Sequence, residues 1–240
     1  MAIKAITFDF WRTLFRDAHG EKRRALRAEA LSAATGKSAD EAAAALEAVN
    51  AVFQQHHVEH MATLYPMDAV RLTCDRLNVD LPAEDAARMA DIFAMAIVQH
   101  SPVPIEGALE AVQTAAAHRP VGLVSDAGLS PGRALRVLLD RHGFTPHFTT
   151  MAFSDEVGVA KPQAPMFETA ARGLGVAPRE LLHIGDLEYT DIVGAKAVGA
   201  VAVLFAGDNT RHLGATEAAH SFTNWDDFRE ALPGLLNGAA

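Results

Sequence analysis

Cysteine is nearly absent from this sequence, in which Cys74 is the single thiol among 240 residues. One cysteine excludes an internal disulfide framework and a zinc site built from several thiolates. Cys74 stands among apolar residues of a helical pattern, which favours a buried, structural role for its side chain.

Long apolar runs are also missing, since none approaches the roughly 18 residues that a bilayer-spanning helix needs. Residues 1–4 lead directly into an apolar strand pattern, which leaves no room for a signal peptide. We therefore expect a soluble, cytoplasmic protein that does not associate with membranes.

Basic residues are outnumbered, with 21 Lys and Arg against 30 Asp and Glu and a formal net charge of −9. This balance argues against nucleic acid or an anionic membrane as the main partner. An anionic small-molecule substrate would have to meet locally clustered positive charge. Composition leaves both a monomer and a homodimer open.

Two kinds of periodicity divide the chain, whose residues are 50% hydrophobic and can fill one or two packed domains. Residues from about 16 to 99 show helical periodicity, and four amphipathic helices are expected to bundle. From residue 106 onward, helical and strand patterns alternate, which predicts an α/β fold: a Rossmann-like parallel sheet with helices on both faces. We predict a core domain over residues 1–15 and 103–240, and an inserted helical domain over residues 16–102.

The expected elements of the core follow from this alternation. Strands are predicted over residues 3–8, 121–125, 148–153, 181–184 and 200–205. Helices are predicted over residues 106–118, 133–142, 165–174 and 191–198.

A carboxylate ends the first predicted strand, because the run from Ile3 to Phe8 is followed by Asp9. Open α/β sheets place their chemistry at the carboxyl ends of their strands. An isolated Asp after a strand is more often a helix N-cap or a paired surface residue. Three motifs farther along the chain reverse that preference: Ser125-Asp126 after the second strand, Lys161-Pro162 before a helix, and Gly185-Asp186 followed by Asp191.

This order of motifs resembles the haloacid dehalogenase (HAD) superfamily of hydrolases, in the subfamily with a helical cap inserted after the first motif. The resemblance covers residues 3–14 and about 104–205, and it leaves the helical segment unmatched. It implies a HAD core with a cap domain, and it implies hydrolysis through a covalent intermediate at Asp9. Ser125 and Lys161 would contact the transferring group. From their positions in the sequence, Asp126, directly after Ser125, could extend this cradle, and Arg12, near the entrance to the helical segment, could bind an anionic substrate.

The resemblance also implies a metal site. Its ligands would be Asp9, the backbone carbonyl of Trp11, Asp186 and the second acidic residue of that motif, Asp191. Oxygen ligands without His or Cys suit Mg²⁺ rather than zinc. A carboxylate and a phosphate ester repel each other, so a divalent cation would have to bridge them.

Each of these residues also has a plain structural interpretation. Lys161 could be a solvated lysine before a helix, and Ser125 an ordinary strand-end serine. Thr13 could brace the loop after Asp9 or only close a local turn. Arg23 and Arg24, near the entrance to the helical segment, could bind an anionic substrate but are better interpreted as exposed helix charges.

Trp11 departs from the family pattern, because HAD phosphatases carry a second Asp at this position. That Asp protonates the leaving group, and such acid–base assistance contributes about 10²–10⁴ in rate. An indole cannot replace it, although Asp126 or Glu188 could act as a substitute acid. An aromatic residue here is similar to the haloacid dehalogenases, which use no metal.

We give more weight to Asp186 and Asp191 and predict a Mg²⁺-dependent phosphatase acting on a small phosphorylated metabolite. A 2-haloacid dehalogenase-like hydrolase using an ester at Asp9 is the alternative. A catalytically weak member that binds a phosphorylated ligand is the third possibility.

Overall fold

The computed structural model describes residues 2–61 and 63–237, without the side chains of residues 54 and 56–60. A six-stranded sheet forms its centre, with the strand order β5-β4-β1-β6-β7-β8. Its strands are β1 Ala5–Phe8, β4 Val121–Ser125, β5 Thr150–Phe153, β6 Leu181–Gly185, β7 Val201–Phe205 and β8 His220–Phe222. All neighbouring strands are parallel, which confirms the predicted α/β class.

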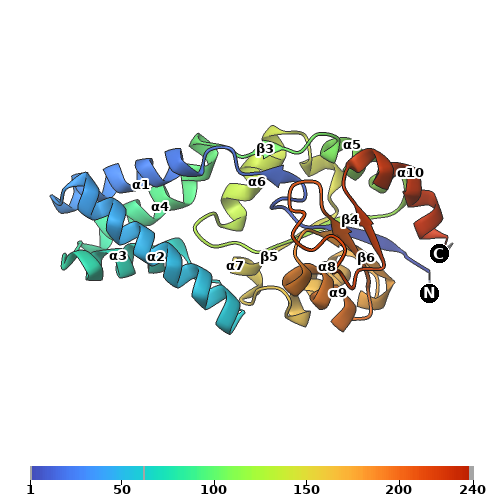
Figure 1. Ribbon diagram of the computed structural model, residues 1–240. Coiled ribbons are helices and arrows are strands. Elements are labelled where there is room, and N and C mark those ends of the chain that lie inside the picture. Colours follow the sequence, from blue (N-terminus) through green and yellow to red (C-terminus); the bar gives the residue numbers. More distant parts are fainter. Residues whose placement is uncertain (1, 62, 238–240) are drawn as a thin grey trace.

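Helices cover both faces of this sheet (Figure 1). One face packs on α5 Ala108–His118, α6 Gly132–Arg141 and α10 Trp225–Leu236, and the other on α8 Ala164–Leu174 and α9 Val193–Ala197. Alternate residues of β1 serve the two apolar clusters, since Ile6 and Phe8 belong to one and Ala5 to the other. This two-sided burial explains why the strands read as continuous apolar runs.

Four further helices lie together beside the sheet, at the left of Figure 1. They are α1 Gly20–Thr35, α2 Ala39–His60, α3 Pro66–Leu77 and α4 Ala83–Gln99. They share an apolar cluster of their own, which includes Leu31, Val70, Phe93 and the buried Cys74. The structural role predicted for Cys74 is thus confirmed. The division into a core and a cap domain at residues 15/16 and 102/103 stays a prediction.

Both connections to the four helices run side by side. The short strands β2 Phe15–Arg16 and β3 Val103–Pro104 pair antiparallel, and Ile105 donates its backbone N–H to the carbonyl of Leu14 over 2.8 Å. This ribbon spans the predicted domain boundary and fixes where the helices attach, directly after the loop that carries Asp9.

The segment after β6 differs from the prediction of an α-helix over residues 191–198. A π-helical turn, Glu188–Ile192, precedes α9. The Asp191 carboxylate accepts a hydrogen bond from the backbone N–H of Leu187 (3.1 Å), while Ile192 donates its N–H to the Leu187 carbonyl five residues back. Wide turns of this kind are frequent at functional sites.

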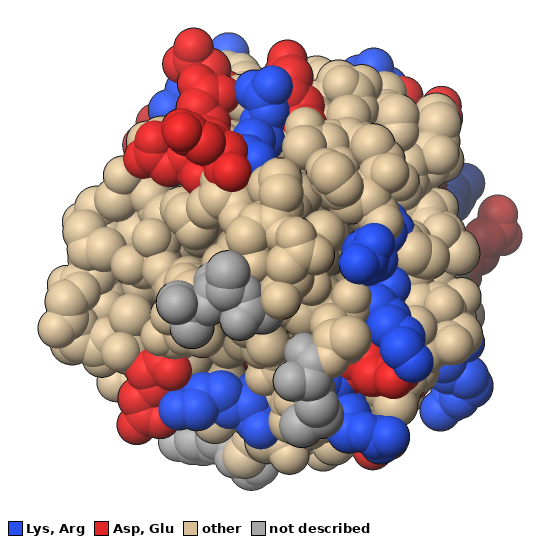
Figure 2. Space-filling view, turned by 90° about the vertical axis from the view of Figure 1, so that its right-hand side faces the viewer, with Lys and Arg blue, Asp and Glu red and all other residues tan. Residues whose placement is uncertain are grey.

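The remaining short elements connect the core. They are α7 Ser154–Val157 and the 3₁₀ turns Thr145–His147 and Pro178–Glu180. No helix within residues 2–61 and 63–237 is long and apolar enough to cross a membrane. On the end of the molecule that bears both termini, basic and acidic side chains lie next to one another around a largely uncharged centre (Figure 2).

Candidate active site

Three buried carboxylates meet at the carboxyl edge of the sheet. Asp9 follows β1 and Asp186 follows β6, and these two strands are neighbours. Asp191 reaches the same point from the π-helical turn. Each contributes an oxygen, and the three oxygens lie within 4.8 Å of one another. The order of motifs along the chain therefore becomes a single cluster in space.

Lys161 is buried within this cluster and is 2% exposed. Its Nζ lies 2.6 Å from Asp9 Oδ1 and 2.6 Å from Asp191 Oδ1. The backbone N–H of Lys161 donates to Asp126 Oδ1 over 2.9 Å, which ties its loop to the end of β4. The solvated-lysine interpretation is wrong, because two carboxylates of the core hold the ammonium.

Two polar residues inside the strands extend the network, and the sequence analysis missed both. His183 Nε2 lies 3.1 Å from Asp191 Oδ1, and His183 Nδ1 lies 2.9 Å from Thr7 Oγ1. Thr7 and His183 are direct partners in the β1–β6 pairing. Their signal was present as polar residues within apolar strand runs, since a buried polar side chain needs a partner.

Gly185 has a steric reason to precede Asp186. A Cβ at position 185 would lie 2.2 Å from Cγ of Asp191. Only glycine therefore allows the Asp191 carboxylate to approach the end of β6. The Thr190 hydroxyl adds a further hydrogen bond to Asp191 Oδ2 (3.2 Å), so both oxygens of Asp191 are engaged.

Asp186 has a partner that the sequence analysis also missed. Asn209, from the segment after β7, donates its side-chain N–H to Asp186 Oδ2 over 2.8 Å. No residue of the described chain donates to Asp186 Oδ1. One oxygen of this carboxylate is therefore positioned, while the other is left for a ligand.

Burial and mutual repulsion set the charges of these groups. Burial raises the pKa of Asp9, with further increases from the charges of Asp191 and Asp186 that Lys161 opposes. Burial, then the charge of Asp191, raises the pKa of Asp186 to about 7. Burial alone would raise the pKa of Asp191, but the charge of Lys161 and the bond from His183 hold it well below its usual range.

Burial would likewise lower the pKa of Lys161, yet the charges of Asp191 and Asp9 raise it. One ammonium thus faces three buried carboxylates, of which it satisfies Asp191 most fully. The remaining negative charge of Asp9 and Asp186 is what a divalent cation would neutralise, and their oxygen atoms suit Mg²⁺. This donor set fits the predicted metal.

The other predicted site residues surround the cluster. Ser125 is fully buried, and its hydroxyl donates to the carbonyl of Asp126 over a long 3.2 Å. Thr13 Oγ1 is buried and has no hydrogen-bond partner among the described residues. Arg12 adopts a left-handed backbone conformation (φ 55°) and is exposed, and its charge lowers the pKa of Asp186. Arg12 therefore lies close enough to the cluster to act on its electrostatics.

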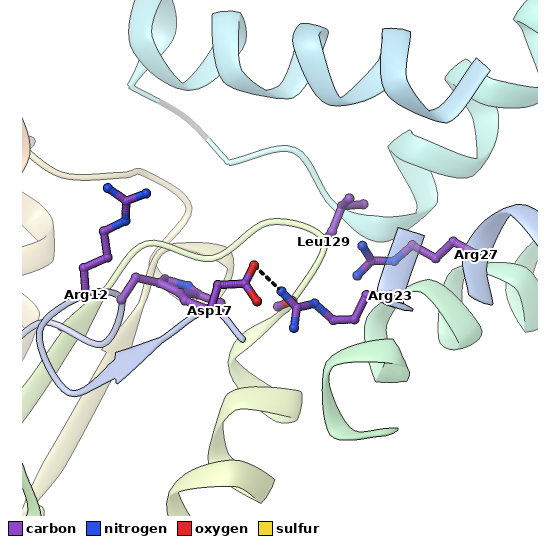
Figure 3. Close-up of a pocket in the computed structure, with 7 residues that line it drawn as sticks. Arg12, Asp17, Arg23, Arg27 and Leu129 are labelled. Atoms are coloured by element: carbon purple, nitrogen blue, oxygen red, sulfur yellow. Dashed lines mark ion pairs between the residues drawn. The ribbon is translucent and has the colours of Figure 1, made fainter. Parts of the chain in front are cut away.

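A pocket of about 350 Å³ opens between the loop after β1 and α1 (Figure 3). Its lining includes Trp11, Arg12, Asp17, Arg23, Arg27 and Leu129. The prediction of an exposed Arg23 is wrong: this side chain is buried and pairs with Asp17 Oδ2 over 2.6 Å. Arg24, in contrast, is exposed as predicted. Helical periodicity could not reveal the burial of Arg23, because its partners, the carbonyl of His100 and the carboxylate of Asp17, lie outside α1.

Comparison with known proteins identifies the family. The model of the haloacid dehalogenase-like hydrolases matches residues 3–199, which confirms the predicted resemblance. A glyceraldehyde 3-phosphate phosphatase of Methanopyrus kandleri is 43% identical over 65 residues, 27% of this chain and 28% of that protein. A phosphoserine phosphatase of Thermus thermophilus is 39% identical over 61 residues, 25% of this chain and 24% of that protein. The alignments thus span about a quarter of these curated relatives.

Solved structures agree on the fold over nearly the whole chain. The HAD-hydrolase YfnB of Bacillus subtilis, bound to magnesium, superposes with a TM-score of 0.68 at 16% identity, covering 97% of this chain and 99% of that one. A 2-haloacid dehalogenase of Pseudomonas syringae gives a TM-score of 0.73 at 17% identity, with the same coverage of 97% and 99%. Both likenesses establish the fold alone.

Proposed function

Because the chain belongs to the haloacid dehalogenase-like hydrolases, we propose that it is a Mg²⁺-dependent phosphatase that hydrolyses a small phosphorylated metabolite through an aspartyl-phosphate at Asp9. The observation that carries this proposal is the cluster of Asp9, Asp186 and Asp191 around Lys161. Relatives named as phosphatases support it.

The metal would be held by Asp9, Asp186 and the backbone carbonyl of Trp11. When bound, Mg²⁺ would offset the repulsion between the Asp9 carboxylate and the phosphate and would polarise a phosphoryl oxygen. Asp191 was predicted among the ligands, but the bonds to both of its oxygens favour a positioning role. In that role it would hold Lys161 and shape the turn beside Asp186.

In the first chemical step, an oxygen of Asp9 would attack phosphorus while the ester P–O bond breaks and its electron pair leaves with the alcohol oxygen. The Lys161 ammonium would stabilise the phosphoryl oxygens. Ser125 could exchange its long bond to the Asp126 carbonyl for a shorter one to a phosphoryl oxygen. Water would then attack phosphorus while the bond between phosphorus and the Asp9 oxygen breaks, which releases inorganic phosphate with a proton of that water and restores the Asp9 carboxylate.

The leaving group lacks an evident acid. Trp11 cannot donate to an alkoxide, and the two substitute acids are engaged elsewhere. Asp126 accepts from the Lys161 backbone, and the Glu188 carboxylate accepts from Thr216 Oγ1 (2.6 Å) and from the backbone N–H of Glu217 (2.9 Å). We therefore expect esters with stable leaving groups to react fastest.

A second candidate is dehalogenation of a 2-haloacid through an ester at Asp9. Trp11 favours it, because halide leaves without a proton. The site argues against it, because a buried cluster of three carboxylates could hold a cation and has no evident use in expelling halide. A catalytically weak phospho-ligand-binding protein is the third candidate, favoured by the same absence of an acid at Trp11.

A substrate panel with and without metal tests the proposal. Phosphate esters and 2-haloacids are assayed with Mg²⁺ and with EDTA, using Asp9→Asn as the inactive control. The proposal expects phosphate release that requires both Mg²⁺ and Asp9. Halide release that is unaffected by EDTA would establish the dehalogenase, and absence of turnover on every compound would favour the binding protein.

A further inference from the structure

The pocket between the loop after β1 and α1 is lined by three arginines and a single carboxylate. Arg12 enters it from the loop that follows Asp9, and Arg23 and Arg27 enter from α1. In Figure 3, the side chains of Arg23 and Arg27 both extend from the helix toward the side on which Asp17 and Arg12 lie. Three cations and one carboxylate therefore line this pocket, with Arg12 and Arg27 on opposite sides of it in this view.

Arg27 is the unusual member of this group, because it is buried to 6% exposure without an ion pair. Its Nε and Nη2 donate to the backbone carbonyl of Phe93, at 3.1 and 2.9 Å. Within residues 2–61 and 63–237, no carboxylate pairs with its guanidinium, and its Nη1 makes no hydrogen bond. A buried cation without a counter-charge is unfavourable unless a ligand supplies one.

A second cation, Arg23, acts on the charge of Arg27. Burial, and then the charge of Arg23, lower the pKa of Arg27 to about 10. Arg23 itself is 6% exposed and shares its guanidinium between Asp17 and the carbonyl of His100, which is 2.9 Å from Nη1. Asp17 therefore compensates Arg23, whereas Arg27 has the carbonyl of Phe93 and the face of the Phe93 ring, 6.0 Å from its centroid, but no carboxylate partner in the described chain.

The position of the pocket relates it to the candidate active site. Trp11 and Arg12 line it and follow Asp9 after a single residue, Phe10. Arg12 also acts on the charge of Asp186. A molecule with its phosphoryl group at Asp9 could thus extend past the Trp11 ring toward α1, and the pocket volume of about 350 Å³ suits a small metabolite.

We propose that this pocket binds a second anionic group of the substrate, so that the preferred substrates are small phosphate esters that also carry a carboxylate or a second phosphate. Arg27 would hold that group, with Arg23 beside it and Arg12, from the opposite side of the pocket, adding charge. Guanidinium groups suit both anions, because their planar N–H donors match carboxylate and phosphate oxygens. The proposal rests on the phosphatase function and adds a substrate class to it.

Matched substrate pairs test the proposal and separate the two anions. O-phosphoserine is compared with O-phosphoethanolamine, which lacks only the carboxylate, and glucose 1,6-bisphosphate is compared with glucose 1-phosphate. In at least one pair, we expect KM to be about tenfold or more lower for the member that carries the second anionic group. Charge-assisted hydrogen bonds to a buried site contribute this much. The pair that shows the difference identifies the anion.

Three variants assign the effect to the pocket. Arg27→Met should raise KM about tenfold for the substrate with the second anionic group. It should leave KM for its partner compound unchanged, with little change in kcat. Asp17→Asn should act in the opposite direction and lower KM for the substrate with the second anionic group, because it removes the one carboxylate of the pocket that repels that group. Lys22→Met, an exposed cation of the same helix, is the matched control and should change neither KM.

Binding measured by calorimetry on an Asp9→Asn background keeps the proposal independent of turnover. If wild type hydrolyses phosphate esters but binds both members of each pair equally, the pocket proposal is overturned and the phosphatase stands. If wild type hydrolyses no phosphate ester, the phosphatase proposal fails. The pocket proposal then depends on whether Arg27→Met abolishes tighter binding of the compound with the second anionic group. The pocket proposal would also be overturned if Asp17→Asn bound the compound with the second anionic group more weakly than the protein with Asp17 does.

Discussion

Neutralising Asp186 should stabilise the metal-free protein, even though it damages the metal site. Burial and the charge of Asp191 raise the pKa of this carboxyl from an ordinary 3.8 to about 7. Each unit of pKa corresponds to about 1.4 kcal/mol, so ionised Asp186 destabilises the folded state by on the order of 4 kcal/mol. Asp186→Asn removes this charge, and its side-chain oxygen can still accept from Asn209.

The sign of the pH dependence follows from linkage. A carboxyl whose pKa is higher in the folded state binds more protons there than in the unfolded state between about pH 4 and 7. Stability without metal should therefore fall as pH rises through this window and level off above it. Bound Mg²⁺ favours the ionised form, so the stabilisation that Mg²⁺ provides should grow over the same window.

Urea unfolding at pH 5 and pH 8, with EDTA or Mg²⁺, measures these effects. We expect Asp186→Asn to raise the free energy of unfolding at pH 8 in EDTA and to lose most of the Mg²⁺ response. Asp208→Asn, a nearby exposed acid, is the matched control and should change neither. An Asp186→Asn variant that is less stable than wild type in EDTA, or a metal response equal to that of wild type, would refute this reasoning.

Three further substitutions test other parts of the site. Lys161→Met should reduce kcat by about 10²-fold or more. It should also lower the free energy of unfolding by roughly 3–5 kcal/mol, because it leaves buried carboxylates unpaired. Unchanged stability in urea would contradict the buried ion pairs. Wild type should show a steep dependence of rate on leaving-group pKa and a burst in stopped-flow assays, and Trp11→Asp should flatten that dependence; a flat wild-type profile without a burst would indicate a substitute acid. His183→Phe should lower kcat and thermal stability together by loosening Asp191, whereas unchanged kcat would limit His183 to packing.

The sequence predicted those parts of the molecule that depend on local pattern. Strand ends carry Asp9, Ser125 and Asp186, and the apolar runs before them marked these strands to within two residues. Parallel pairing then brings the strand ends to one edge, so a linear order of motifs was enough to predict the cluster.

Contacts between distant segments could not be predicted in the same way. Asn209, from the segment after β7, bonds Asp186. Arg27 of α1 bonds the carbonyl of Phe93 in α4, and this contact between two helices could not be predicted from either helix alone. The π-helical turn depends on the Asp191 carboxylate bonding the backbone of Leu187, which helical periodicity does not register. α10, in contrast, was overlooked although Asn224 caps it and its apolar residues recur at helical spacing.

Trapping the covalent intermediate tests the central claim most directly. Wild-type protein is mixed with a phosphate ester and Mg²⁺, quenched, reduced with borohydride and digested for mass spectrometry. An acyl phosphate at Asp9 would be reduced to homoserine, so the peptide that contains residue 9 should change mass only when both ester and Mg²⁺ are present. Hydrolysis of the ester without this change, or the same change in EDTA, would contradict a Mg²⁺-dependent aspartyl-phosphate at Asp9.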